Sequence, residues 1–209
     1  MRYIFLVFVL AVSFMDSGSA LPVETRHGGW NLEAERDGIK IYTRSVIGSK
    51  LKQVRAVVSL KAPMETVLGV LTDYKGYSDW MNNVTESYVV DHPSDSVHYV
   101  FRHEDAPWPV QNRYHVDKMV VSTEEHAATL SFKSMPNYLD KTDEAIEVQR
   151  YEGEWRIQET TRGLCEVELV FDENPGGFIP TWLVNYLAVD APYKTMANLR
   201  ERVATLSKS

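Results

Sequence analysis

The sequence predicts an α+β fold in which a curved antiparallel β-sheet wraps around one long C-terminal α-helix. Between residues 39 and 172, apart from a helical stretch that begins at Pro63, successive segments alternate apolar and polar residues with a period of two, and short turn sequences join most of them. Short connections favour antiparallel strands. From Ile179 onward the apolar period changes to 3.6 residues, which indicates a helix.

The first twenty residues have the pattern of an export signal. Arg2 supplies a positive charge, residues 3–15 are mostly apolar, and Gly18, Ser19 and Ala20 are the small residues at which a signal peptidase cuts. The apolar run is shorter than the roughly 20 residues that span a bilayer, so a retained membrane anchor is the weaker alternative. We therefore expect a signal peptide over residues 1–20, one mature domain over 21–209, and a periplasmic or alternatively extracellular location.

Composition limits the partners of the mature domain. The formal net charge of −7 argues against nucleic acid and against permanent electrostatic attachment to anionic lipid. Cys165 is the single cysteine, so no intramolecular disulfide forms and the core alone must stabilise the fold. We expect a monomer that contacts membranes transiently through apolar groups.

The N-terminal half is expected to contain two helices and two strands. Residues 28–36 carry Trp30 and are interpreted as a short helix, while residues 39–44 and 52–60 alternate as strands. Pro63 is expected in the first turn of the next helix, where its missing N–H has no cost. The apolar stripe of that helix comprises Met64, Val67, Leu68, Leu71 and Tyr74.

The second half is expected to be a meander of strands followed by the long helix. The strands are predicted at residues 84–90, 97–102, 112–121, 127–133, 153–159 and 164–172, and residues 135–146 receive no assignment. The helix is predicted to begin near 179–181. Pro192 interrupts its pattern, so we expect a kink or break there, with Asp190 able to cap a second segment.

Three stretches carry a family resemblance: Leu-Thr-Asp-Tyr-Lys-Gly-Tyr-Ser-Asp-Trp at 71–80, Asp-Ala-Pro-Trp-Pro-Val-Gln-Asn-Arg at 105–113, and Gly-Gly-Phe-Ile-Pro-Thr-Trp-Leu-Val-Asn at 176–185. In this order and spacing the chain resembles a bacterial exported member of the START (StAR-related lipid-transfer) family, within the wider Bet v 1-like superfamily. The resemblance covers residues 30–203. It implies a helix-grip fold and an internal cavity for one hydrophobic ligand, without enzymatic activity.

The resemblance and the inward faces of the strands together give one candidate set of ligand-binding residues. Trp108 and Trp182 occupy the positions at which the family's cavity entrance is gated. The alternative for the aromatic members is that they only fill a core. The set is Trp80, Phe101, Trp108, Arg113, Phe132, Trp155, Val167, Leu169, Phe171, Trp182, Leu183 and Tyr186.

Arg113 shares its strand face with His115 and Asp117, which predicts a solvent-facing side with an ion pair at the edge. The functional alternative is a cation that meets a lipid head group near the cavity mouth. The charged pair sometimes found deep in the family's cavity has no evident match here. Its candidate positions in this strand are apolar: Val116, Met119, Val120 and Val121.

The sequence contains no recognised motif of a catalytic or metal-binding site. His98 and His103 are five residues apart on a strand, which sends them to opposite faces, and no His-Glu-x-x-His, Gly-x-Ser-x-Gly or phosphate-binding glycine loop occurs. We therefore expect no metal, no cofactor and no catalytic residue. The expected function is binding of a lipid or other hydrophobic small molecule, with possible transfer between membranes. The alternatives are a cyclase-type or hydrolase-type enzyme, which needs convergent titratable groups in the cavity, and a module that only senses a ligand or binds a protein.

Overall fold

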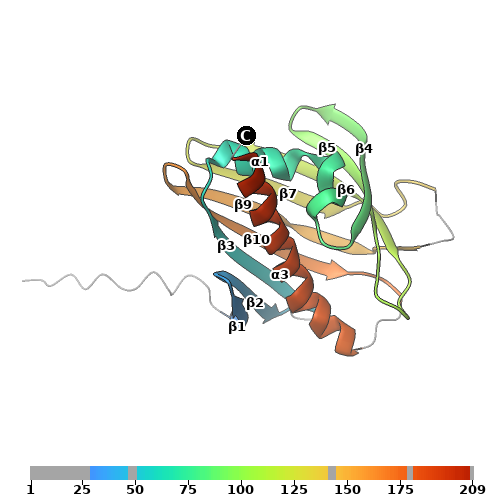
Figure 1. Cartoon of the computed structure of the whole chain (residues 1–209). Coiled ribbons are helices and arrows are strands. Elements are labelled where there is room, and N and C mark those ends of the chain that lie inside the picture. The colour runs from blue at the N-terminus through green and yellow to red at the C-terminus, as the bar shows by residue number, and fades with distance from the viewer. Residues whose placement is uncertain (1–28, 47–50, 141–144, 178–180, 208–209) are drawn as a thin grey trace, which may run out of the picture.

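A computed structural model describes residues 29–46, 51–140, 145–177 and 181–207; within α3, the side chains of residues 181, 182, 185 and 186 are outside the description. The described residues form one sheet in the order β1-β2-β3-β10-β9-β7-β6-β5-β4, with β8 pairing beside β6 (Figure 1). The pairs along this path are antiparallel, and β8 is parallel to β6. The strands are β1 (Asn31–Arg36), β2 (Ile39–Ser45), β3 (Lys52–Leu60), β4 (Val84–Ser94), β5 (Val97–Glu104), β6 (Arg113–Thr123), β7 (Ala127–Ser134), β8 (Ile146–Glu147), β9 (Arg150–Thr161) and β10 (Leu164–Asn174).

Helix α3 (Thr181–Leu206) crosses one face of the sheet, and its C-terminal end lies beside α1 (Met64–Thr72) (Figure 1). A 3-10 turn, η2 (Tyr74–Gly76), and the short helix α2 (Tyr77–Trp80) lead from α1 into β4. This arrangement confirms the predicted helix-grip fold. The signal peptide predicted over residues 1–20 lies outside the described residues. In the described part, no helix is long and apolar enough to cross a membrane.

The helix predicted over residues 28–36 is wrong. Residues 31–36 form β1, which pairs with β2 through a tight turn at Asp37 and Gly38, whose φ angles are 51° and 73°. Positive φ at both central residues is the geometry that Asp-Gly favours in two-residue hairpins. The Asp-Gly dipeptide was therefore the sequence signal that indicated a hairpin.

The strand predictions are confirmed for β3 and β10, which pair with each other in the sheet. β3 spans the predicted 52–60, and Val54, Ala56, Val58 and Leu60 are buried. β10 starts at the predicted residue and continues two residues further, with its odd-numbered side chains from Cys165 to Phe171 buried. Alternation thus identified the covered face of both strands.

Both helix starts agree with the sequence to within a residue. Pro63 is the N-cap of α1, one position before the expected first turn, and α3 begins at Thr181. The break expected at Pro192 is absent: α3 continues through it as one helix, which packs against β2 and β3. Asp190 caps nothing there; its carboxylate lies 3.3 Å from Arg36 Nη1.

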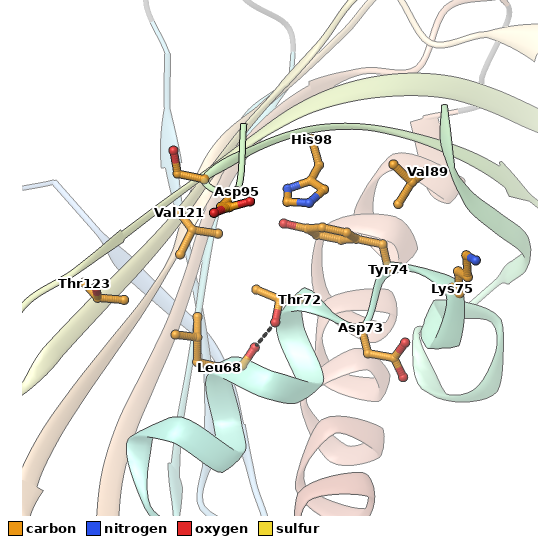
Figure 2. Close-up of a pocket in the computed structure, with 11 residues that line it drawn as sticks. Leu68, Thr72, Asp73, Tyr74, Lys75, Val89, Asp95, His98, Val121 and Thr123 are labelled. Atoms are coloured by element: carbon orange, nitrogen blue, oxygen red, sulfur yellow. Dashed lines mark hydrogen bonds between the residues drawn. The ribbon is translucent and has the colours of Figure 1, made fainter. Parts of the chain in front are cut away.

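The β4–β5 hairpin bends away from its neighbours. The pairing of β4 with β5 shifts register at three places, and two of these shifts lie between Val89 and Ser94. Such bulges bend a strand and increase its twist. Between this hairpin and the α1–η2 junction lies a groove of about 670 Å³ (Figure 2).

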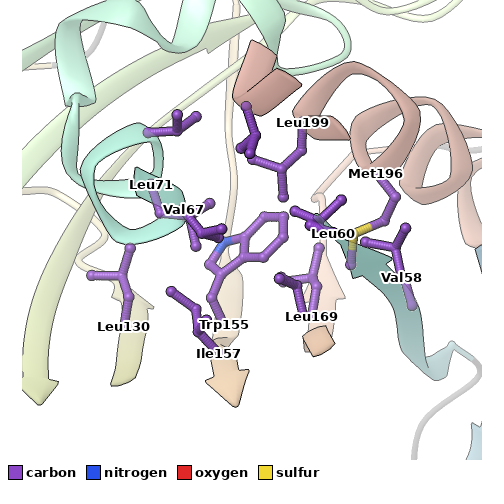
Figure 3. Packing of buried hydrophobic residues seen from close by; sticks show 14 of the residues in the cluster. Val58, Leu60, Val67, Leu71, Leu130, Trp155, Ile157, Leu169, Met196 and Leu199 are labelled. Carbon is purple, nitrogen blue, oxygen red and sulfur yellow. The ribbon is translucent and has the colours of Figure 1, made fainter. Parts of the chain in front are cut away.

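The space between the sheet and α3 is closely packed at the end near α1. The Trp155 ring, 2% exposed, lies between Val67 and Leu71 of α1 and Met196 and Leu199 of α3 (Figure 3). Burying an aromatic side chain of this size is among the largest single contributions to a core. Because this end is solid, the open space between the sheet and α3 lies toward the other end of α3.

Residues 135–146, which the sequence left unassigned, cross the outer face of β5 and β6 as far as they are described. Leu139 and Ala145 pack against a small separate cluster made of Phe101, Tyr114 and Val116. Ile146 then pairs with Arg113 as the start of β8. This segment therefore covers the outer face of the strands whose inner face lines the cavity.

Candidate ligand cavity

Two adjoining cavities lie between α3 and the inner face of the sheet. The inner one has a volume of about 100 Å³ and the outer one about 50 Å³. Asn83, Glu104, Glu173 and Leu187 line both, so they form the neck between them. The outer cavity is also lined by Ala106, Pro107 and Val110 of the loop between β5 and β6 and by Leu183 of α3, and we call this part the mouth.

A buried ion pair forms the polar end of the inner cavity. Arg102 Nη2 donates to Asp117 Oδ2 at 2.6 Å, and Arg102 Nε donates to the same oxygen at 3.2 Å. Arg102 is 4% exposed and Asp117 is fully buried. Burial opposes the charge of Asp117, but His115 and Arg102 outweigh it and lower the pKa of this carboxyl.

His115 links the ion pair to the neck. Its Nδ1 lies 2.9 Å from Asp117 Oδ1, and its Nε2 lies 3.1 Å from Glu104 Oε1. Burial opposes a charged imidazole, yet the neighbouring carboxylates outweigh it and raise the pKa of His115 to about 9. The protonated ring can therefore donate a hydrogen bond to both carboxylates at neutral pH.

The register of β5 and β6 brings these groups together. Arg102 is paired with His115 and Glu104 with Arg113, and alternation turns Arg102, Glu104, His115 and Asp117 to the same side. The grouping of Arg113, His115 and Asp117 on one face was right, but the expectation that this face is exposed is wrong. The charged side chains satisfy one another, which makes their burial possible.

The statement that the deep charged pair has no match is also wrong. The pair is made by two strands, Arg102 on β5 and Asp117 on β6, so a search within β6 alone could not find it. Val116 belongs to the outer cluster, on the opposite face from Asp117. The signal available in the sequence was an Arg and an Asp at inward positions of two strands joined by one loop.

Glu173 adds a carboxyl at the neck. Burial, followed by the charge of Glu104, raises the pKa of Glu173 to about 7. The Tyr151 ring packs against the charged network. Its centre lies 4.9 Å from the Arg102 guanidinium carbon and 5.4 Å from the His115 ring, which it meets edge-on. The neck therefore contains one carboxyl group whose pKa lies well above the usual range for a glutamate.

Arg113 lines the outer cavity and is 5% exposed. Its Nη1 donates to the carbonyl oxygen of Gln111, and its Nη2 donates to that of Gly176 at 3.3 Å. Its Nε has no hydrogen-bond partner among the described residues, and burial lowers the pKa of the guanidinium. Arg113 thus joins the β5–β6 loop to the Gly176–Gly177 link that leads into α3.

The remaining candidate residues fall into three groups. Trp155, Leu169 and Phe171 line the inner cavity, and Arg113 and Leu183 line the outer one. Trp80, Phe132 and Val167 are buried in the main core, where the Phe132 ring stacks on Tyr151 at 4.6 Å. Phe101 packs on the outer face of the sheet, and Trp108 is 90% exposed on the loop at the mouth. The side chains of Trp182 and Tyr186 lie outside what the structure describes. Sequence reasoning missed Arg102, Glu104, Tyr151 and Glu173, and it placed His115 and Asp117 on a solvent-facing side instead of in the buried network.

Comparison with known proteins agrees with this geometry. The family described as "Polyketide cyclase / dehydrase and lipid transport" matches residues 60–200. The uncharacterized protein PA1579 of Pseudomonas aeruginosa is 34% identical over 205 residues, covering 96% of this chain and 97% of that protein. Human phosphatidylcholine transfer protein is 27% identical over 168 residues, covering 76% of each.

Among solved structures, the STAR-related lipid transfer protein from Xanthomonas axonopodis (fragment 25–204) superposes with a TM-score of 0.78 at 32% identity, covering 84% of this chain and 99% of that one. The fold, the ordered motifs and these matches agree. The chain belongs to the polyketide cyclase/dehydrase and lipid transport family, as a member of its START (StAR-related lipid-transfer) type.

Proposed function

We propose that this protein binds one lipid between the sheet and α3 and carries it between membranes. The observation that carries the proposal is a cavity with a polar wall and an apolar wall. Arg102, Glu104 and His115 of β5 and β6 make one wall polar, with Asp117 bonded behind them, while Trp155, Leu169 and Phe171 of β9 and β10 make the other apolar. An amphipathic molecule fits such a site with its head group at the network and its chain along the apolar wall.

Loading requires the cavity to widen. Its two parts total far less than the roughly 300–1,000 Å³ of common ligand pockets, so we propose that the cavity opens further to admit a lipid. The hinge for opening is the link before α3, where Gly176 and Gly177 have φ angles of 71° and 64°. Movement there would lift the first turns of α3 from the β5–β6 loop.

Trp108 supports a membrane-contacting role for the mouth. An indole with 90% of its surface exposed, on a loop beside the cavity, suits the interface between water and lipid. The net charge of −7 leaves apolar contact as the attractive force, so the encounter is brief. We propose that the protein acts as a monomer in the periplasm after removal of residues 1–20.

The structure provides one argument for the enzymatic alternative and one against it. Titratable groups do converge in the cavity, although the sequence suggested apolar inward positions. However, Asp117 and Glu104 are both bonded to His115, and the raised pKa of His115 keeps it protonated at neutral pH. A base must be free to accept a proton, so His115 cannot act as one, and Glu173 is left as the candidate base for the enzymatic alternative.

The test is extraction and mass spectrometry of the protein purified from its native compartment, followed by transfer of a fluorescent phospholipid between vesicles. We expect one lipid per chain. Ala191→Phe, which fills the inner cavity, should abolish uptake, whereas Ala204→Phe on the exposed side of α3 should not. A delipidated protein that takes up no fatty acid, sterol or phospholipid probe would refute the proposal.

A further inference from the structure

The groove between α1–η2 and the β4–β5 hairpin is separate from the lipid cavity. Tyr74 packs edge-on against Tyr77 at 5.8 Å, Tyr77 against Trp80 at 5.7 Å, and Trp80 against Trp155 at 6.4 Å. These aromatic rings lie between the groove and the inner cavity, whose wall includes Trp155. With a volume of about 670 Å³, the groove has room for a small molecule.

Two buried polar atoms in the groove wall lack partners. The Tyr74 hydroxyl and His98 Nδ1 have no hydrogen bond among the described residues, although Tyr74 is only 4% exposed. The two rings lie 5.0 Å apart, and both side chains border the same open space (Figure 2). Burial raises the pKa of Tyr74 to about 12, so the hydroxyl stays protonated. Leaving such groups unpaired is unfavourable, and a ligand that bonds to them would recover that loss.

The other side chains of the groove set the charge of that ligand. Asp95 at the hairpin tip lines the groove, and its carboxylate lies beside Tyr74 and His98 (Figure 2). Asp73 lies 3.9 Å from Arg202, and Lys75 stands at the rim. A carboxylate, a phenol oxygen and an imidazole nitrogen can all accept hydrogen bonds, while an anion would meet Asp95.

The apolar walls complete the description. Leu68, Val89 and Val121 line the space on either side of these acceptors, and the Thr72 hydroxyl is already bonded to the Leu68 carbonyl at 2.9 Å (Figure 2). The bulges in β4 between Val89 and Ser94 hold the hairpin away from α1. The groove therefore offers three hydrogen-bond acceptors together with three aliphatic side chains.

We propose that this groove is a second binding site, which takes the primary ammonium group of a small amphipathic amine. The three N–H donors of the ammonium match Asp95, the Tyr74 hydroxyl and His98 Nδ1, and its hydrocarbon part contacts Leu68, Val89 and Val121. The site does not require the lipid-transfer function, and amine binding can be measured whether or not a lipid is bound.

The experiment compares three six-carbon probes by NMR titration of the isotope-labelled protein: hexylamine, hexanol and hexanoate. Hexylamine should bind most tightly and shift the amide signals of Tyr74, Asp95 and His98. Tyr74→Phe and Asp95→Asn should each weaken it by about tenfold, the loss of one charge-assisted hydrogen bond. Tyr88→Phe, on the outer side of the same hairpin, is the matched control and should change nothing.

Three results would overturn the proposal. They are binding of hexanol or hexanoate as tight as that of hexylamine, amide shifts that cluster at the lipid cavity, and an unchanged affinity for hexylamine in Tyr74→Phe.

Since the ammonium group occurs both in solution and on lipids, vesicles provide a second arm of the experiment. Displacement of hexylamine by phosphatidylethanolamine vesicles, but not by phosphatidylcholine vesicles, assigns the source to a membrane; no displacement by either assigns it to a soluble amine.

Discussion

Arg102 and Asp117 meet across neighbouring strands, with Nη2 2.6 Å from Oδ2 and almost no surface of either side chain exposed. A buried ion pair is a weak source of stability compared with apolar packing, because both charges lose their hydration. It is nevertheless costly to break, since the remaining charge has no solvent. Its presence beside a cavity therefore suggests a role in ligand recognition.

The first prediction concerns this pair. Asp117→Asn leaves Arg102 and His115 without their shared carboxylate and should lower the free energy of unfolding by about 3–5 kcal/mol, as measured by urea denaturation. Asp190→Asn, which removes the exposed partner of Arg36, should cost no more than about 1 kcal/mol. Similar small losses for both variants would contradict the geometry of the buried network.

The second prediction concerns pH. The carboxyl of Glu173 titrates near 4.5 in the unfolded chain and near 7 in the folded protein, so the folded state binds more protons between these values. Its contribution to the free energy of unfolding is full below pH 4.5 and is lost as the pH rises through 7. His115 acts in the same direction between about 6.5 and 9.

Glu173→Gln should therefore flatten the fall in stability between about pH 5 and 7.5, measured by denaturation across this range. Glu166→Gln, on the exposed face of the same strand, serves as the control and should keep the slope of the parent protein. An unchanged slope in Glu173→Gln would show that this carboxyl does not titrate in the neck.

These residues also show what could be read from the sequence. Alternation located β3 and β10 because each has one covered face, and the change of period located the start of α3. Alternation cannot say whether a polar face is wet or closed over by another element. The face of β6 with Arg113, His115 and Asp117 was therefore misassigned, since only the fold shows that Arg102, Glu104 and Glu173 come from other strands to meet it.

The third prediction concerns the link before α3. Arg113→Gln loses the guanidinium hydrogen bonds to the carbonyl oxygens of Gln111 and Gly176, so the start of α3 should open more often. Hydrogen exchange should rise in residues 181–187 and remain unchanged in β3. Arg44→Gln, which removes a contact with Gln53 far from the mouth, is the control. Equal exchange in the two variants would mean that Arg113 does not restrain opening.

The last prediction distinguishes a tryptophan at the cavity entrance, Trp108, from a tryptophan in the core, Trp155. Trp108 is almost fully exposed beside the outer cavity, whereas Trp155 is 2% exposed in the packed end of the grip. Trp108→Ala should slow lipid transfer between vesicles in stopped-flow measurements and leave the melting temperature unchanged, because no packing is lost. Trp155→Ala should cost about 3–5 kcal/mol of stability through the cavity that it leaves. If Trp108→Ala transferred lipid at the parent rate, the loop would not be the part of the mouth that meets the membrane, and the entrance would have to lie along α3 instead.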